Sequence, residues 1–208
     1  MLHGRQELLK AVPIPDAAVW VELGAGTGSN LELLGDRVSS MQQVHLVDLS
    51  PSLLKVASQR IEKLGLTNVP LHEKDATLFT PPQAADVVVC SYSLTMIPDW
   101  FAAIDNARCI LKPNGFLAVV DYYFSRNHPT IGQVRHGWSL RTYAPTLFER
   151  NNVRPNPDHI HYLHHHFDPI HFSEHMGKAY GRYLNVPYYL FIGSPKPFKG
   201  EVARLIET

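Results

Sequence analysis

A glycine-rich stretch near the N-terminus could hold a ligand close to the protein backbone. Glu22-Leu23-Gly24-Ala25-Gly26-Thr27-Gly28 follows a short apolar run at residues 18–23 and precedes a helix-like segment at residues 29–34. Glycine lets the backbone turn tightly and approach a ligand without an intervening side chain. Many turns that bind no ligand also contain several glycines, so the glycines alone do not identify a ligand site. The acidic residues that follow in the sequence provide the further evidence.

Acidic residues follow the next two strand-like runs. Asp48, with Leu49 after it, ends the run 44–48, and Asp75-Ala76 closes the run 69–72. The first carboxylate can accept hydrogen bonds from both ribose hydroxyls, and the Asp–Ala pair offers a carboxylate and an amide to an adenine edge. Each aspartate could instead cap its own turn. Three such features at successive strand ends together predict a nucleoside-containing cofactor at one edge of a sheet.

The elements that must position these residues alternate along the first two-thirds of the chain. We expect strands at residues 18–23, 44–48, 69–72, 85–90 and 116–122, and helices at about 29–34, 51–64 and 100–111. Such alternation favours a parallel sheet flanked by helices.

The segment after residue 122 has a different pattern. We expect a long functional loop to residue 145 with one helical turn, a short helix at 147–151, and a terminal strand pair at 162–172 and 188–193. That pair would complete a Rossmann-like, seven-stranded, mostly parallel α/β sheet.

Composition and charge exclude several classes of protein. Lys+Arg and Asp+Glu both number 19, which gives no reason to expect nucleic-acid binding. The 208 residues suit one domain, 1–208, with a cofactor-binding core at about 18–122 and a substrate side at about 123–193. Cys90 and Cys109 lie in apolar runs, which favours reduced thiols and a cytoplasmic protein. The sequence predicts neither a secretory signal nor a membrane-spanning run.

The glycine spacing resembles motif one of the class I S-adenosylmethionine-dependent methyltransferases. The turn is Gly-x-Gly-x-Gly rather than the Gly-x-Gly-x-x-Gly of dinucleotide folds, and residues 111–117 resemble the usual lead into a fifth strand. The resemblance covers residues 18–122 and implies S-adenosylmethionine as cofactor, with an NAD-dependent enzyme as the alternative. It implies that the cofactor contacts are Glu22, Gly24, Ala25, Gly26, Gly28, Asp48, Leu49, Asp75, Ala76, Ser91 and Tyr92.

Segments that vary among methyltransferases give a narrower resemblance. Residues 91–100, 119–122 and 187–193, together with Gly4-Arg5, are similar to the methyltransferase component of betaine-lipid synthesis. That resemblance implies three methylations of the amino group of diacylglyceryl-homoserine. A lipid head group would then be the substrate, with peripheral contact at the inner membrane surface.

Two residues at the end of the predicted fifth strand are the catalytic candidates. Methyl transfer requires an uncharged nucleophile held about 3 Å from the methyl carbon. Asp121 could orient an amine or accept its proton, although on position alone it could equally be a turn residue. Tyr122 follows it directly.

Aromatic and basic residues are candidates for binding the substrate. An aromatic face stabilises a methylated cation by roughly 0.5 to 2 kcal/mol. The aromatic candidates are Tyr92, Tyr122, Tyr123, Trp138 and Tyr143, most of which could instead pack in the core or loops. Arg135 and Arg141 are the candidates for holding a substrate carboxylate.

A cluster of histidines lies between His159 and His175. We expect no metal there, because neighbouring residues of a strand point to opposite faces and no cysteine or spaced acid pair completes a shell. The cluster instead predicts a solvated or interface strand, with anionic lipid head groups as one hypothesis for its partner.

Three functions therefore stay open. The first is an N-methyltransferase for an amino-acid-derived lipid, and the second is a methyltransferase for a small soluble amine, hydroxyl or carboxyl. The third is a cofactor-binding subunit without catalysis. An apolar groove near residues 122–145 would favour the first over the second, and the sequence leaves the oligomeric state open.

Overall fold

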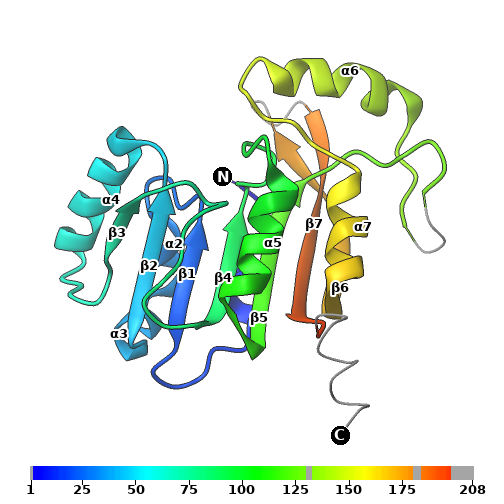
Figure 1. Ribbon diagram of the computed structural model, residues 1–208. Helices are drawn as coiled ribbons and strands as arrows, with labels where there is room; N and C mark the ends of the chain where they lie inside the picture. The colour runs from blue at the N-terminus through cyan, green and yellow to red at the C-terminus, as the bar shows by residue number, and fades with distance from the viewer. Residues whose placement is uncertain (1, 130–132, 180–183, 198–208) are drawn as a thin grey trace, which may run out of the picture.

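The computed structural model describes residues 2–129, 133–179 and 184–197 (Figure 1). The strands are β1 (Val19–Leu23), β2 (Gln43–Asp48), β3 (Leu71–Glu73), β4 (Ala85–Ser91), β5 (Leu111–Tyr122), β6 (Phe167–Ala179) and β7 (Leu184–Pro195). The helices are α1 (Arg5–Ala11), α2 (Asn30–Leu34), α3 (Arg37–Ser40), α4 (Pro51–Lys63), α5 (Trp100–Ile110), α6 (Trp138–Glu149) and α7 (Asp158–His166).

The seven strands form one sheet in the order β3-β2-β1-β4-β5-β7-β6. Strands β1 to β5 are parallel, and β7 lies antiparallel between β5 and β6. The predicted Rossmann-like, mostly parallel sheet is confirmed. The strand order reverses between β1 and β4, and ligands of such sheets bind at this point, outside the carboxyl ends of the strands.

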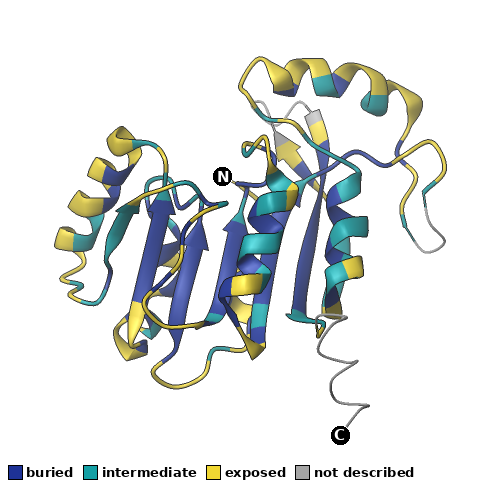
Figure 2. Ribbon diagram, in the orientation of Figure 1, coloured by how far each residue is buried: buried dark blue, intermediate teal, exposed yellow. Residues whose placement is uncertain are grey.

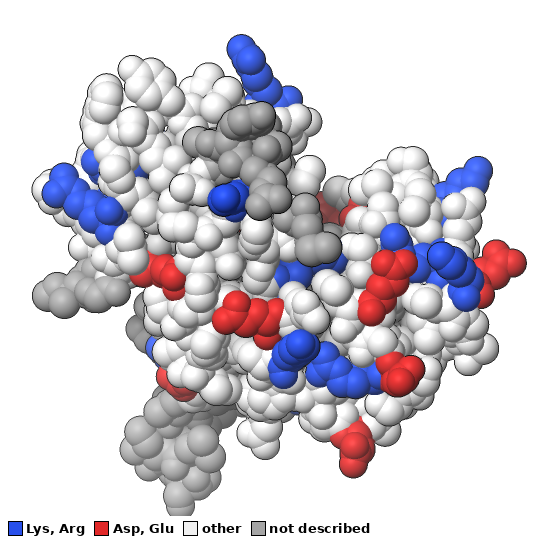
Figure 3. Space-filling view, turned by 180° about the vertical axis from the view of Figure 1, so that it is seen from behind, with Lys and Arg blue, Asp and Glu red and all other residues white. Residues whose placement is uncertain are grey.

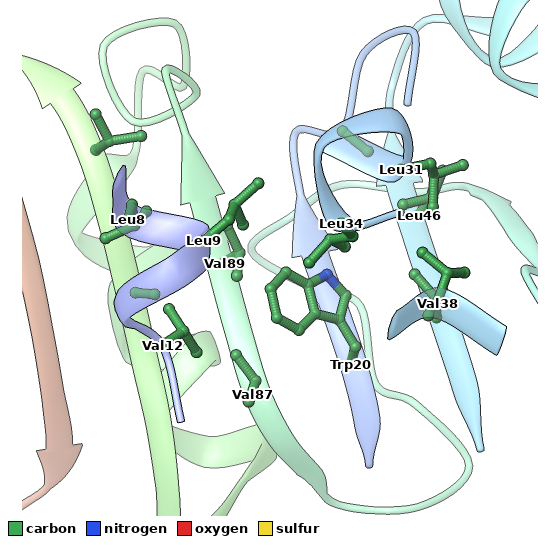
Figure 4. Packing of buried hydrophobic residues seen from close by; sticks show 14 of the residues in the cluster. Leu8, Leu9, Val12, Trp20, Leu31, Leu34, Val38, Leu46, Val87 and Val89 are labelled. Carbon is green, nitrogen blue, oxygen red and sulfur yellow. The ribbon is translucent and has the colours of Figure 1, made fainter. Parts of the chain in front are cut away.

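Two hydrophobic clusters hold the helices against the two faces of the sheet. Trp20 of β1 is fully buried against α1, α2 and α3 on one face, and Figure 4 shows Leu9, Leu34 and Val87 around its ring. The next residue, Val21, points to the opposite face, where α5 and α7 pack. Because both faces are covered, the central strands are buried along their length (Figure 2).

The C-terminal third differs from its prediction. The segment expected to be a loop contains most of the twelve-residue helix α6. The prediction of a strand at 162–172 is wrong for residues 162–166, because residues 158–166 form α7 and the strand begins only at Phe167. Ile160 and Leu163, three residues apart, face the core from one side of α7. Strand β5 begins at Leu111 rather than at Phe116, with a register shift against β4. Helix α1 was not predicted.

Helix α6 stands beyond the carboxyl ends of the parallel strands (Figure 1). Its Ala144 and Phe148 pack on Phe124 and Val186, which ties the helix to the ends of β5 and β7. Across the described ranges, no helix is long and apolar enough to span a bilayer.

Candidate active site

The glycine turn after β1 takes a shape that the sequence allows because of its glycines. Gly24 and Gly26 have φ values of 73° and 55°, in the left-handed region that side chains disfavour. A Cβ atom on Gly24 would lie 2.4 Å from Cβ of Ser93, so the turn packs directly against the loop after β4. A Cβ atom on Gly26 would meet no atom within 4 Å, since this residue faces open space.

Asp48 at the end of β2 fixes the glycine turn. Its Oδ2 accepts the Gly26 amide at 2.7 Å, and its Oδ1 accepts the Ser50 amide at 2.9 Å. At the end of β3, Oδ1 of Asp75 accepts the amide and the hydroxyl of Thr77, each at 2.8 Å. A carboxylate oxygen can accept more than one hydrogen bond, so both groups can also bind a ligand.

Glu22 is a buried acid directly beside the turn. Its Oε1 accepts the side-chain amide of Asn30 at 2.7 Å, while Oε2 is buried without a partner among the described residues. Burial raises the pKa of Glu22 to about 7, against the opposing effects of Arg5 and of the Asn30 hydrogen bond.

These groups share one cavity of about 730 Å³ at the carboxyl ends of β1, β2, β3 and β4. Its size lies within the range of small-molecule and cofactor sites. It is lined by all the predicted cofactor residues except Gly28: Glu22, Gly24, Ala25, Gly26, Asp48, Leu49, Asp75, Ala76, Ser91 and Tyr92. Gly28 lies outside this lining. A Cβ atom at Gly28 would lie 3.0 Å from Cδ1 of Leu46, so the absence of a side chain at Gly28 lets the turn pack closely against β2.

The loop after β4 forms one wall of the cavity. Tyr92 has a φ of 56°, which is uncommon for a bulky side chain and typical of residues held at functional sites. Its hydroxyl donates to the His3 carbonyl at 2.7 Å, and its ring lies 4.6 Å from that of Tyr122. Ser91 presents a buried hydroxyl that has no partner in the described part of the chain.

Asp121 lies behind this wall rather than in the cavity lining. The side chain is fully buried and accepts the Thr95 amide at 3.1 Å, the Thr95 hydroxyl at 2.8 Å and the Tyr122 amide at 2.8 Å. Burial raises the pKa of Asp121 to about 7 although these hydrogen bonds favour the charged form. The structure therefore places Asp121 where it can hold the Thr95 loop in position.

Most of the predicted substrate residues lie outside the lining of this cavity. Tyr92 lines it, whereas Tyr123 is buried in the core and donates its hydroxyl to Glu174. On α6, Trp138 and Tyr143 are 65% and 62% exposed, with ring centroids 5.8 Å apart. Arg141, half-buried on the same helix, donates to the side chain of Asn127, and Arg135 is exposed.

The histidine cluster falls on α7 and β6 instead of one strand. His159 is fully buried against Trp100, and burial lowers the pKa of His159 to about 3. Within the described ranges, no group of three His, Cys, Asp or Glu side chains could hold a metal ion. His164-His165-His166 form the last turn of α7.

Residues from the N-terminal segment complete the cavity and were not predicted. Leu2 and Arg5 line it from before and within α1. Arg5 lies 17 residues before Glu22 in the sequence, and no spacing pattern connects the two. Only the resemblance of the Gly4-Arg5 pair pointed to this segment.

Comparisons with known proteins agree with this geometry. Residues 21–117 match a family model described as a methyltransferase domain. A trans-aconitate 2-methyltransferase from Variovorax paradoxus (strain S110) is 34% identical over 116 residues, which are 55% of this chain and 42% of that protein. The match therefore spans less than half of that relative's length.

Solved structures share the fold at low sequence identity. The YcgJ protein from Bacillus subtilis has a TM-score of 0.75 at 14% identity, covering 95% of this chain and 100% of that one. The N-methyltransferase NodS from Bradyrhizobium japonicum WM9, solved with S-adenosyl-L-homocysteine, has a TM-score of 0.66 at 16% identity, covering 93% and 86%. The chain therefore carries a methyltransferase domain at residues 21–117, set in a seven-stranded sheet whose fold it shares with these solved structures.

Proposed function

We propose that the protein transfers a methyl group from S-adenosylmethionine to a small-molecule acceptor. The observation that carries this proposal is the single cavity that joins the glycine turn, Asp48, Asp75 and Glu22 at the point where the strand order reverses. The cofactor supplies an electrophilic methyl group on a sulfonium, so the protein mainly has to hold the two reactants in line.

The chain's own residues divide this work. Asp48 holds the glycine turn and is placed to orient the ribose, and the open space at Gly26 lets a ligand approach the backbone. Asp121 acts as a positioning residue, because its oxygens fix Thr95, which lies in the chain between the lining residues Ser93 and Met96. Tyr92 lines the cavity and, among the described residues of that lining, is the aromatic group that could face a cationic centre.

A nitrogen on a lipid head group is the first candidate for the acceptor. Residues 133–154 carry four arginines and one glutamate, a net charge of +3 in a chain whose net charge is zero. On α6, Trp138, Tyr143 and Leu147 are all more than 40% exposed. In the view from behind, the top of the molecule, where this helix lies, is mostly uncharged, with a basic side chain projecting at its edge (Figure 3). Exposed aromatic and basic groups on a helix are typical of contact with an anionic membrane surface.

Aromatic contacts connect this helix to the cavity. Phe148 of α6 lies 5.3 Å from Tyr122, which lies 4.6 Å from Tyr92 in the cavity wall. Helix α6 therefore stands close to the wall of the cavity. This arrangement supports the betaine-lipid hypothesis, with diacylglyceryl-homoserine as the acceptor.

A small soluble acid is the second candidate. The observation in its favour is the named activity of the Variovorax relative, which is methylation of trans-aconitate. For such a substrate the exposed face of α6 would have no part in turnover.

One assay separates the candidates. The purified protein is incubated with S-adenosylmethionine carrying a radiolabelled methyl group and with either diacylglyceryl-homoserine in anionic vesicles or trans-aconitate in solution. Label in the lipid fraction supports the first candidate, and label in the soluble ester supports the second. Binding of S-adenosylmethionine without label in either acceptor would refute both acceptors, and no binding would refute the proposed activity itself.

A further inference from the structure

Two histidines of β6 converge on one serine hydroxyl. Nε2 of His171 lies 3.0 Å from Oγ of Ser173, and Nε2 of His175 lies 2.8 Å from the same oxygen. The three residues alternate along the strand, so their side chains share one face of the sheet, and all three are partly exposed. Because β6 ends the strand order, they lie at the edge of the sheet. We call these three residues the His-Ser-His site.

The acid within this stretch of β6 is turned away from the site. Successive residues of a strand point to opposite faces, which places the side chains of Glu174 and Lys178 on the other face. There the Glu174 carboxylate accepts the Tyr123 hydroxyl and, at 3.0 Å, the Val134 amide. The nearest acid in the sequence is therefore engaged elsewhere and does not neutralise the two histidines.

Strand β7, α1 and the N-terminal segment supply the titratable neighbours of the site. The ring of Tyr188 stacks on His175 and on His3, with ring centroids 5.2 Å and 6.2 Å apart. Burial, and then the charge of Glu7 on α1, raise the pKa of Tyr188, so this hydroxyl stays neutral at ordinary pH. In the described part of the chain, neither His3 nor Glu7 forms a hydrogen bond with His171 or His175.

Protonation turns the His-Ser-His site into a set of convergent donors. A serine hydroxyl has one proton to donate and two lone pairs that accept, so it can bond to two neutral imidazoles at once. When both rings carry a proton on Nε2, both donate, and the hydroxyl must direct its own proton elsewhere. Two positive charges so close together also repel each other. An anion at this point would accept from the three groups and offset the repulsion.

We propose that the His-Ser-His site binds a tetrahedral oxyanion, such as a phosphoryl group, once its two histidines are protonated. Histidine is the side chain that ordinarily changes charge between pH 5 and 8, and charge-assisted hydrogen bonds to phosphate are roughly twice as strong as neutral ones. The phosphoryl group can belong to a free anion or to a phospholipid head group. The site lies outside the lining of the cavity, so the inference does not depend on the proposed methyl transfer.

Titration of inorganic sulfate into the intact chain, followed by NMR of the backbone amides of β6, tests this assignment. Sulfate has the same charge at pH 5.5 and pH 8.0, so a difference between the two titrations reports a change in the protein. We expect binding about tenfold or more tighter at pH 5.5, since one charge-assisted hydrogen bond is worth at least about that factor. Replacing His171 and His175 together by glutamine should reduce the affinity at pH 5.5 to the value at pH 8.0. Ser173→Ala keeps both rings and should cause a smaller loss.

Replacing His161 and His165 together by glutamine is the matched control. These residues are also two histidines four positions apart, but they lie on α7 and do not contact Ser173. This control should bind sulfate as the wild type does. Equal affinity of the wild type at the two pH values would overturn the assignment, and so would wild-type affinity in the β6 double variant. The same loss in the α7 control would also overturn it, because total charge would then explain the effect.

Vesicles identify the source of the oxyanion. Sedimentation at pH 5.5 is compared for phosphatidylcholine vesicles with and without phosphatidylglycerol, using the wild type and the β6 double variant. A several-fold loss of sedimentation in the variant would assign the site to phospholipid head groups. Equal sedimentation of the two proteins, with sulfate binding that depends on the histidines, would assign it to a free anion. If neither sulfate nor vesicle binding depended on the histidines, the site would be refuted, whatever the outcome of the methyl-transfer assay.

Discussion

Replacing Gly26 by alanine tests whether the backbone of the glycine turn approaches the cofactor. Gly26 has a φ of 55°, and its added Cβ would meet no protein atom within 4 Å. Gly65, after α4, has a φ of 64°, its Cβ also meets nothing within 4 Å, and it does not line the cavity. The two substitutions therefore impose the same backbone strain, and only one places a methyl group in the cavity.

The expected changes in Tm and in ligand affinity follow from the left-handed backbone at the two glycines and from the position of residue 26 in the cavity. A left-handed backbone costs a non-glycine residue about 1–2 kcal/mol. For a domain of this size that loss lowers Tm by about 2–8 °C, and we expect it for both Gly26→Ala and Gly65→Ala. The methyl group at residue 26 should also displace the ligand and weaken S-adenosylhomocysteine binding about tenfold or more, since one lost hydrogen bond is worth about 1 kcal/mol and steric displacement adds to it.

Thermal unfolding and calorimetric titration of both variants provide the two readouts. Similar drops in Tm with a loss of affinity only in Gly26→Ala would support the assigned cavity. Wild-type affinity in Gly26→Ala would refute the reasoning, because it would mean that no ligand atom comes near the turn. Equal affinity losses in both variants would refute it too, since backbone strain alone would then explain the effect.

Three further predictions concern other parts of the site. Asp48→Asn keeps only one of two acceptor oxygens and should weaken S-adenosylhomocysteine binding about 10- to 100-fold by calorimetry, whereas unchanged affinity would exclude a ribose contact. Because the pKa of Asp121 is raised from 3.8 to about 7 on folding, its contribution to stability should be largest below pH 4. That contribution should be lost as pH rises toward 7, by up to about 1.4 kcal/mol per pH unit in denaturant titrations, and Asp121→Asn should flatten this slope. Replacing Trp138 and Tyr143 together by alanine should reduce sedimentation with anionic vesicles several-fold while leaving calorimetric cofactor affinity within about twofold; equal sedimentation of both proteins would count against docking through α6.

The N-terminal half shows how much local sequence can specify. Every predicted strand from 18–23 to 85–90 is present within a few residues, because a buried parallel strand needs a continuous apolar run and little else. The α4 boundaries also follow local chemistry, since Ser50 accepts the Leu53 amide as the N-cap and Pro51 opens the helix. Beyond residue 122 the elements depend on tertiary packing, and the predictions for α6 and α7 failed there.

The sequence by itself determined the parallel strands β1 to β4, the glycine turn and the strand-end acids that share its edge, because each depends on short-range patterns of apolar, glycine and acidic residues. Only the tertiary structure decided which groups face the cavity. It placed Asp121 behind the wall against Thr95, left Trp138 exposed on a helix, and brought Arg5 to Glu22 through Asn30. Contacts between residues far apart in the chain leave no periodic trace in the sequence, since they depend on how α1 and α6 pack on the finished sheet.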